Sequence, residues 1–135
     1  MANALYGLGR QAFLEGDIAW DTDTIRAVLI DTGTYTVDID VHNAYDDLSG
    51  VVGSESPAFS TKTTTLGTAD ADDLTFSSVS GATVEALVIF QDVGTASVDR
   101  LIAYIDTVSS GLPVTPNGGD ITVTWDDGAN KIFTL

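Results

Sequence analysis

The chain has 135 residues, enough for one domain with a real hydrophobic core and too few for two. Five basic residues against 20 acidic ones give a formal net charge of -15, which argues against nucleic acid and against an anionic membrane surface as partners. Cysteine is absent, so a disulfide framework and cysteine-ligated metal sites are excluded. We expect no signal peptide in the opening residues, and no apolar run approaches the ~18 residues of a membrane span.

The first predicted element is an α-helix over residues 3–15, within an N-terminal segment 1–17. Asn3 belongs to the residue types that cap helix starts, and Gly16 stands where a C-terminal cap is expected. Each glycine of the internal string GLG weakens an isolated helix by about 1 kcal/mol relative to alanine, so this helix needs a surface to lie against.

One face of this helix is apolar. Its members recur at helical spacing or flank that stripe: Leu5, Leu8 and Ala12, with Tyr6 and Phe13 beside them. We expect the stripe to pack on the protein's own sheet. The alternative is that part of it packs against a neighbouring subunit.

Beyond the helix, the sequence is typical of β-structure. Apolar runs predict strands over residues 24–30, 83–90 and 101–105, each closed by an aspartate and a turn residue. Such a carboxylate can accept hydrogen bonds from the backbone just beyond it, so we expect aspartate to serve mainly in turns. Weaker strands are expected over residues 58–65 and 74–79.

The longest irregular stretch is residues 38–57, DIDVHNAYDDLSGVVGSESP. A short helix within residues 41–48 is compatible with its sequence, and its serine- and glycine-rich remainder predicts an exposed loop. Loops of this length are usually functional or mobile. We therefore expect a partner contact or a change on assembly here.

A C-terminal hairpin is predicted over residues 118–135. Apolar and threonine residues alternate along ITVTW, and DDGAN then offers a turn before a returning strand. On that return we expect Phe133 and Leu135 to be buried. Residues 1–135 are thus predicted to form a single mainly β domain, an antiparallel β-sandwich of jelly-roll or immunoglobulin-like type with an N-terminal α-helix.

No constellation of catalytic residues is evident. His42 is the only histidine, so a structural or exposed role is expected for it. The chain has no Gly-x-Ser-x-Gly elbow and no phosphate-binding loop. The aspartate pairs at 46–47, 72–73 and 126–127 lie in turn-like settings, which favours solvated turns over a catalytic dyad. We predict no enzyme activity, no catalytic residue and no cofactor.

Calcium is the main chemical alternative, because hard cations take several oxygen ligands. Two clusters provide such oxygens: Asp70, Asp72 and Asp73, and Asp126, Asp127 and Asn130. Neither follows the spacing of an EF-hand loop, so no metal site is predicted. A calcium-dependent carbohydrate-binding module stays open as an alternative function.

Four blocks of sequence together resemble small virion proteins of tailed bacteriophages: NALYGLGRQAFLEGDIAW, TIRAVLIDTGTYTV, ALVIFQDVG followed by LIAYID, and GLPVTPNGGDITVTWDDGANKIFTL. The closing block is the most specific of them. The resemblance implies a structural component of the particle and brings no catalytic motif. Residues 38–57 fall outside the resemblance.

This resemblance implies a non-enzymatic capsid cement, or decoration, protein that stabilises the head by binding between major capsid protein subunits. A tail or neck ring component is the alternative within the same family. The implied partners are the major capsid protein and copies of the chain itself in a homo-oligomer, and the implied location is the virion, assembled in the host cytoplasm. A soluble acidic domain of this kind would gain affinity through many symmetric copies.

Overall fold

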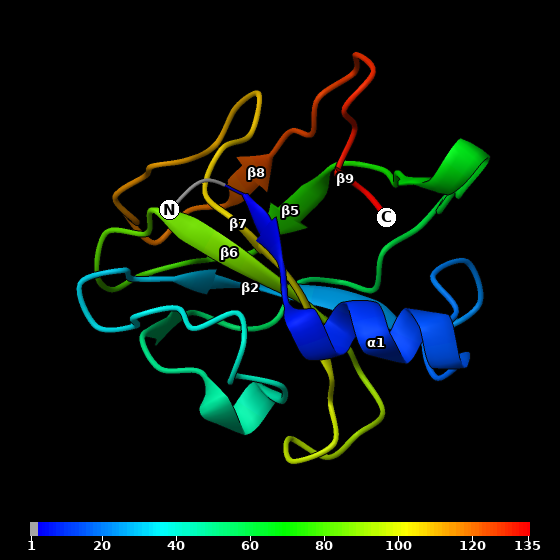
Figure 1. The fold of residues 1–135 in the computed structure, drawn as a ribbon. Helices are drawn as coiled ribbons and strands as arrows, with labels where there is room; N and C mark the ends of the chain where they lie inside the picture. Colours follow the sequence, from blue (N-terminus) through cyan, green and yellow to red (C-terminus); the bar gives the residue numbers. More distant parts are fainter. Residues whose placement is uncertain (1–2) are drawn as a thin grey trace.

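The computed structural model describes residues 3–135 and is mainly β (Figure 1). It contains an antiparallel five-stranded sheet, two two-stranded antiparallel sheets and an N-terminal α-helix, which confirms the predicted β class. Within these residues no helix is both long enough and apolar enough to cross a membrane. Met1 and Ala2, part of the predicted segment 1–17, lie outside the described residues.

The main sheet has the strand order β1-β7-β6-β2-β3. Its strands are β1 (Ala4–Leu5), β2 (Ile25–Ile30), β3 (Val51–Val52), β6 (Ala86–Gln91) and β7 (Leu101–Ile105). One small sheet pairs β4 (Thr68–Ala69) with β9 (Phe133–Thr134), and the other pairs β5 (Leu74–Phe76) with β8 (Ile121–Val123). The α-helix α1 spans Gly7–Glu15, and two short 3-10 helices are η1 (Tyr45–Asp47) and η2 (Thr65–Gly67).

Most predicted strands are confirmed to within a few residues. The runs at 24–30, 83–90 and 101–105 contain β2, β6 and β7, and the run at 74–79 contains β5. The strand predicted over residues 58–65 is wrong, because Thr61 adopts a positive φ of 53° that interrupts an extended run. Only an isolated bridge from Thr63 to Asp70 pairs that stretch.

The central strands bury both of their faces. Along β2, Ile25, Ala27 and Leu29 belong to one apolar cluster, whereas Val28 and Ile30 belong to another on the opposite face. The same alternation runs along β6. Side chains of successive strand residues point to opposite faces, so an apolar residue at nearly every position requires a cover on each side.

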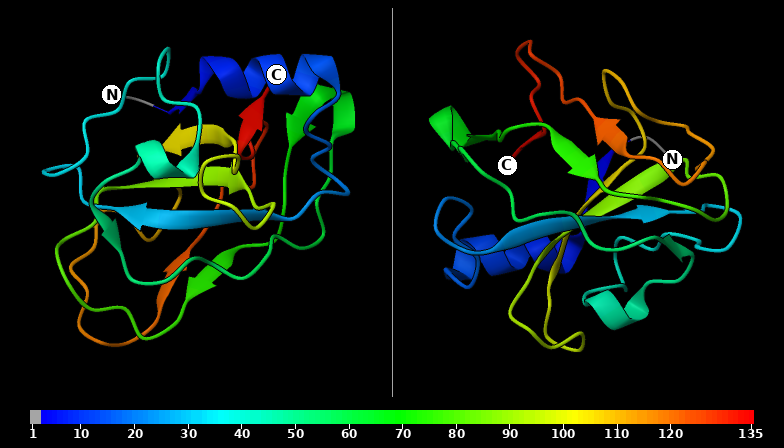
Figure 2. Two further views of the ribbon diagram at one scale, coloured as in Figure 1. Left: turned by 90° about the horizontal axis from the view of Figure 1, so that it is seen from below. Right: turned by 180° about the vertical axis from the view of Figure 1, so that it is seen from behind.

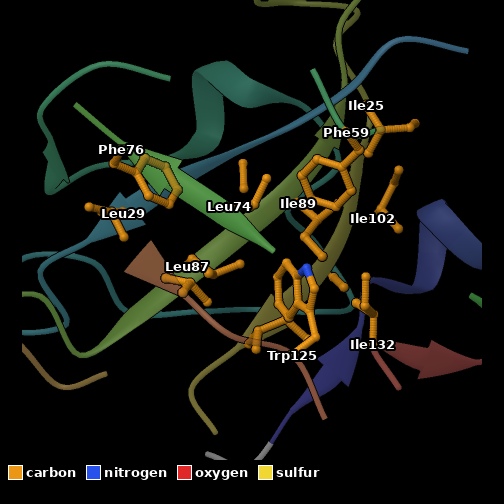
Figure 3. Packing of buried hydrophobic residues seen from close by; sticks show 14 of the residues in the cluster. Ile25, Leu29, Phe59, Leu74, Phe76, Leu87, Ile89, Ile102, Trp125 and Ile132 are labelled. Atoms are coloured by element: carbon orange, nitrogen blue, oxygen red, sulfur yellow. The ribbon is translucent and has the colours of Figure 1, made fainter. Parts of the chain in front are cut away.

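The two small sheets cover one face of the main sheet. Figure 3 shows Leu74 and Phe76 of β5, with Trp125, packed against side chains of the main sheet such as Leu87 and Ile89. All of these residues belong to the larger apolar cluster, which also contains Ile18, Trp20 and Phe59.

The opposite face is covered by irregular chain (Figures 1 and 2). Val37, Ile39, Tyr45, Leu48 and Val51 pack against the second cluster, and η1 lies in this segment in place of the short helix predicted within residues 41–48. Many residues of the loop predicted over 38–57 are exposed, Gly53, Ser54 and Glu55 among them, but Ala44, Val52 and Ser56 are buried. The stretch has no regular pattern because single apolar residues, each at a different angle, make the contacts.

The helix α1 begins later than predicted. Its N-cap is Tyr6, and the chain before it forms the edge strand β1. Asn3 caps no helix: its Oδ1 accepts hydrogen bonds from the backbone amides of Asp106 and Thr107 at 2.8 and 2.9 Å, which closes the end of β7. The predicted cap Gly16 is confirmed, with φ 80° and its amide bonded to the last helical turn.

The predicted docking of the apolar stripe on the sheet is confirmed only in part. Ala12 is buried and Phe13 is half-buried, whereas Leu8 is 39% exposed and Leu5 lies in β1 rather than in the helix. Gly9 lets α1 approach β7 closely, because a Cβ placed there would lie 2.4 Å from the carbonyl oxygen of Leu101.

The predicted hairpin over residues 118–135 is wrong. Its two strands, β8 and β9, pair not with each other but with β5 and β4, which lie about 50 to 65 residues earlier in the chain. The result is an interrupted antiparallel ribbon in which residues 70–73 on one side face the longer stretch 124–132 on the other. Alternation along ITVTW did predict burial of Ile121, Val123 and Trp125 correctly, but Leu135 is 58% exposed rather than buried.

We predict that Gly9→Ala lowers the free energy of unfolding by about 1–3 kcal/mol, because the added methyl group forces the helix away from β7. Gly7→Ala is the matched control, since its Cβ would meet its nearest neighbour, the Ile39 carbonyl oxygen, at 3.4 Å. Urea denaturation of both variants measures the difference. Equal stability of the two variants would show that helix propensity, and not close packing, decides the effect.

Candidate functional site

Aspartate side chains hold the turns of the fold, as the sequence predicted. Asp31, Asp92 and Asp126 each accept a hydrogen bond at 2.9–3.0 Å from the amide of the glycine two residues later. Asp106 is arranged differently, because its carboxylate accepts from the neighbouring Thr107 hydroxyl. Most of the carboxylates singled out by sequence thus have a structural role.

The cluster Asp70, Asp72 and Asp73 does not converge on one point. Asp72 accepts hydrogen bonds from the hydroxyls of Ser60 and Thr61, at 3.1 and 2.8 Å. The Asp73 carboxylate instead accepts from the Trp125 amide at 3.1 Å, and Asp70 lies 3.8 Å from the Lys131 ammonium group. Asp72 therefore ties the ribbon to residues 60–61, whereas Asp70 and Asp73 bridge its two sides.

The segment DDGAN is a self-contained loop. Both carboxylate oxygens of Asp126 accept from backbone amides of the loop itself, at Gly128 and Asn130. The carbonyl oxygen of Asp127 accepts from the Lys131 ammonium group at 3.1 Å. Across residues 3–135, no group of three or more histidine, cysteine or acidic side chains is arranged to hold a metal ion.

His42 ends a chain of hydrogen bonds that reaches the core. Its Nδ1 lies 2.8 Å from the Tyr35 hydroxyl, which lies 2.9 Å from the hydroxyl of Tyr6. The Asp38 amide donates to the same Nδ1 at 3.3 Å, so this nitrogen serves as an acceptor. The arrangement ties the irregular cover to the residue that begins α1, which is the structural role expected for the single histidine.

Burial raises the pKa of all four tyrosines, at positions 6, 35, 45 and 104. The main cause for each is loss of hydration, which penalises the phenolate. For Tyr6 the hydrogen bond to Tyr35 raises the pKa further. Asp47 shows the opposite shift: amides of Asn43 and Ala44 donate to its carboxylate and lower its pKa.

A second polar group that local patterns did not predict surrounds Gln91, the last residue of β6, which is 5% exposed. Its amide donates to the Asp23 carboxylate at 2.7 Å and to the Asp17 carbonyl oxygen at 3.0 Å. The Arg100 guanidinium donates to its side-chain oxygen at 3.3 Å. Every polar atom of this side chain is engaged, so the group fixes the link between α1 and β2 and offers no free chemical function.

The surface is acidic, and only a few of its carboxylates are paired with basic side chains. Ion pairs join Arg26 to Asp92 at 2.8 Å, Arg100 to Asp17 at 3.7 Å and Lys131 to Asp70 at 3.8 Å. Five basic side chains cannot neutralise 20 acidic ones, so a strong negative field remains. Such a field favours a basic partner surface.

An apolar hollow of about 140 Å³ interrupts this acidic surface. It is lined by Phe13, Trp20, Thr64, Gly67, Ala69, Phe133 and Leu135. The ring of Phe133 lies 5.2 Å from that of Trp20 and 6.1 Å from that of Phe13, between centroids. Two fully projecting leucines are sequence neighbours of this lining: Leu14 is 88% exposed and Leu66 is 97% exposed. These features form the candidate interaction surface.

Sequence comparison adds no relative to this description. No protein-family model matches the chain, and no curated protein matches it. The resemblance to phage virion proteins therefore stays a prediction, and the function is argued from the residues themselves.

We predict that calcium stabilises the protein no more than magnesium does at equal concentration. Both ions screen the charge of -15, but the carboxylates of Asp72 and Asp126 already accept hydrogen bonds. A site with a Kd one hundredth of the added concentration would add about 2.7 kcal/mol. Melting temperatures in the two salts measure this. A calcium-specific rise that Asp126→Asn abolishes would contradict the prediction.

We predict that stability falls as the pH rises above about 10, the ordinary pKa of a phenol. Because burial raises the pKa of Tyr6 in the folded chain, its stabilising effect is complete below that pH and is lost above it, where only the unfolded chain releases the proton. Each such phenol adds a slope of about 1.4 kcal/mol per pH unit.

Urea denaturation at about pH 9 and about pH 11 compares wild type with Tyr6→Phe, in which this slope is expected to decrease. Tyr45→Phe is the control, because that phenol is only half-buried and a smaller change is expected. Identical slopes for wild type and Tyr6→Phe would show that Tyr6 does not titrate as described.

Proposed function

We propose that this chain is a non-enzymatic structural protein of tailed-phage virions, specifically a capsid cement protein that binds between major capsid protein subunits. The observation that carries the proposal is the resemblance of the four sequence blocks to small virion proteins. Those blocks supply α1, the central strands β2, β6 and β7, and the strands β8 and β9. The resemblance thus covers these elements together with the turns that flank them.

The placement of polar groups supports a binding role over catalysis. Asp31, Asp72, Asp92 and Asp126 hold turns or ribbon contacts, and His42 is bonded to Tyr35. On the surface of residues 3–135, negative charge predominates and an apolar hollow is present. Such features suit a particle component, because weak contacts repeated in many copies together give a high total affinity.

The predicted β-sandwich is also part of this proposal. We infer that the main sheet and the ribbon of the small sheets serve as the two layers of an antiparallel β-sandwich. The larger apolar cluster, with members from β2, β5, β6 and β8, supports this inference. Jelly-roll and immunoglobulin-like strand orders stay as its alternatives.

A tail or neck ring component is the second candidate within the same family, since the resemblance applies to it equally. The two candidates differ in stoichiometry. Cement proteins occupy positions that repeat over the whole capsid, whereas a ring has one copy per symmetry position. The acidic surface and the proposed location in the virion suit both.

Quantitative mass spectrometry of purified virions tests the proposal, with the major capsid protein in the same sample as the internal standard. We expect a copy number on the order of hundreds per particle, set by the repeat of the capsid lattice. About six or twelve copies would instead support the tail or neck candidate. Presence in infected cells together with absence from virions would refute both.

A further inference from the structure

Leu66 has an unfavourable backbone conformation, and its exposed side chain packs little against its own molecule. It lies in η2 with φ 53° and ψ 35°, the left-handed region that residues with a Cβ rarely adopt. Its side chain is 97% exposed. A single exposed leucine is common in proteins, but one that is also held in a strained backbone and projects beside an apolar hollow points to an external contact.

The hollow beside η2 has the size and chemistry to receive such a side chain. Thr64 and Gly67, on either side of Leu66 in the sequence, line it, and its floor includes Phe13, Trp20 and Phe133. Its volume is about 140 Å³. Apolar cavities near ~150 Å³ admit a group as large as benzene, so one leucine side chain fits.

The distribution of charge favours a second copy of the chain as the partner that binds this face. Residues 56–69 and 128–135 contain no acidic side chain, although the whole chain has 20. No side chain that lines the hollow is charged, and the Asp70 carboxylate beside Leu66 is paired with the Lys131 ammonium group at 3.8 Å. Two copies of a protein with a net charge of -15 repel each other over most of their surfaces, whereas on this face few acidic side chains oppose each other. Depletion of charge is also what distinguishes the core of a protein interface.

We propose that this face, comprising η2, the hollow and the neighbouring β9, is the contact between two copies of the chain, with Leu66 of each copy seated in the hollow of the other. Leu66 and the hollow lie side by side on the same face of one chain. In a two-fold dimer each copy would therefore insert its leucine into the hollow of the other, and the contact would be made twice. The proposed function includes binding between copies of the chain, and this inference names the surface through which they bind. The biological role of the dimer rests on the proposed function.

Sedimentation velocity of the purified chain, from low micromolar to about millimolar concentration, measures the association. Leu66→Asn removes the apolar side chain while keeping a residue that tolerates a positive φ, so the fold should be retained. We expect the dimer to weaken at least tenfold. Val98→Asn is the matched control, since Val98 is 52% exposed in the connection between β6 and β7, which lies far from η2 (Figure 1).

Ionic strength gives an independent readout. Added salt screens the repulsion between two acidic molecules, so the proposed dimer should tighten with salt, whereas docking of a basic partner would weaken. Three outcomes would overturn the inference: a wild-type chain that stays monomeric throughout, equal association of Leu66→Asn and Val98→Asn, or association that weakens with salt.

Failure of this inference is distinguishable from failure of the proposed function. A purified chain that is monomeric yet present in hundreds of copies per virion would refute the two-fold contact and leave the cement proposal intact. The opposite result is a chain that is absent from virions but forms a dimer that salt strengthens and Leu66→Asn disrupts. It would support the two-fold contact and refute the cement proposal. Unchanged melting temperatures of both variants show that loss of folding does not explain the result.

Discussion

The central strands β2 and β6 carry apolar side chains on both faces, and the rest of the molecule is arranged to keep both faces from water. Burial of each large apolar side chain contributes about 1.5–3 kcal/mol, so neither face can stay open. The small sheets cover one face and the irregular stretch ending at β3 covers the other. The helix α1 closes the β7 edge where the short strand β1 stops.

These two covers differ in how they are held. The ribbon is paired by backbone hydrogen bonds in β4–β9 and β5–β8. The irregular cover relies on separate anchors: the Gly7 amide donates to the Ile39 carbonyl oxygen at 2.8 Å, and His42 bonds to Tyr35. Apart from β3 and the bridge between Ala44 and Arg100, this cover has little regular strand pairing, so separate contacts of this kind hold it in place.

Local sequence patterns predicted the core strands because a continuous apolar run leaves few other structures for β2, β6 and β7. Pairing between distant segments has no such local signature. The string DDGAN, flanked by alternating residues, satisfies the pattern of a hairpin, yet β8 and β9 pair with earlier strands. Asn3 likewise resembles a helix cap, but the end of β7 supplies its partners.

For the candidate site, the role of aspartate in turns was predictable because it depends on residues two positions apart. The chain from Tyr6 through Tyr35 to His42 was not, since it joins segments that meet only after folding. The hollow beside Leu66 was also hidden, because Phe13, Trp20 and Phe133 come from distant parts of the chain. The absence of acidic residues from 56–69 is the one signal that sequence alone offered.

The interruption of the ribbon has a practical consequence. The segment 124–132 is longer than the segment 70–73 that faces it across the ribbon. The loop around Asp126 therefore projects between the two paired regions and belongs to neither. Its turn is closed by its own amides. Lengthening a surface loop costs little chain entropy, about 0.6 kcal/mol per doubling, so a foreign peptide can be grafted after Gly128 while the flanking strands keep their register. On a particle with many copies, that position would display an antigen or an affinity tag at high density.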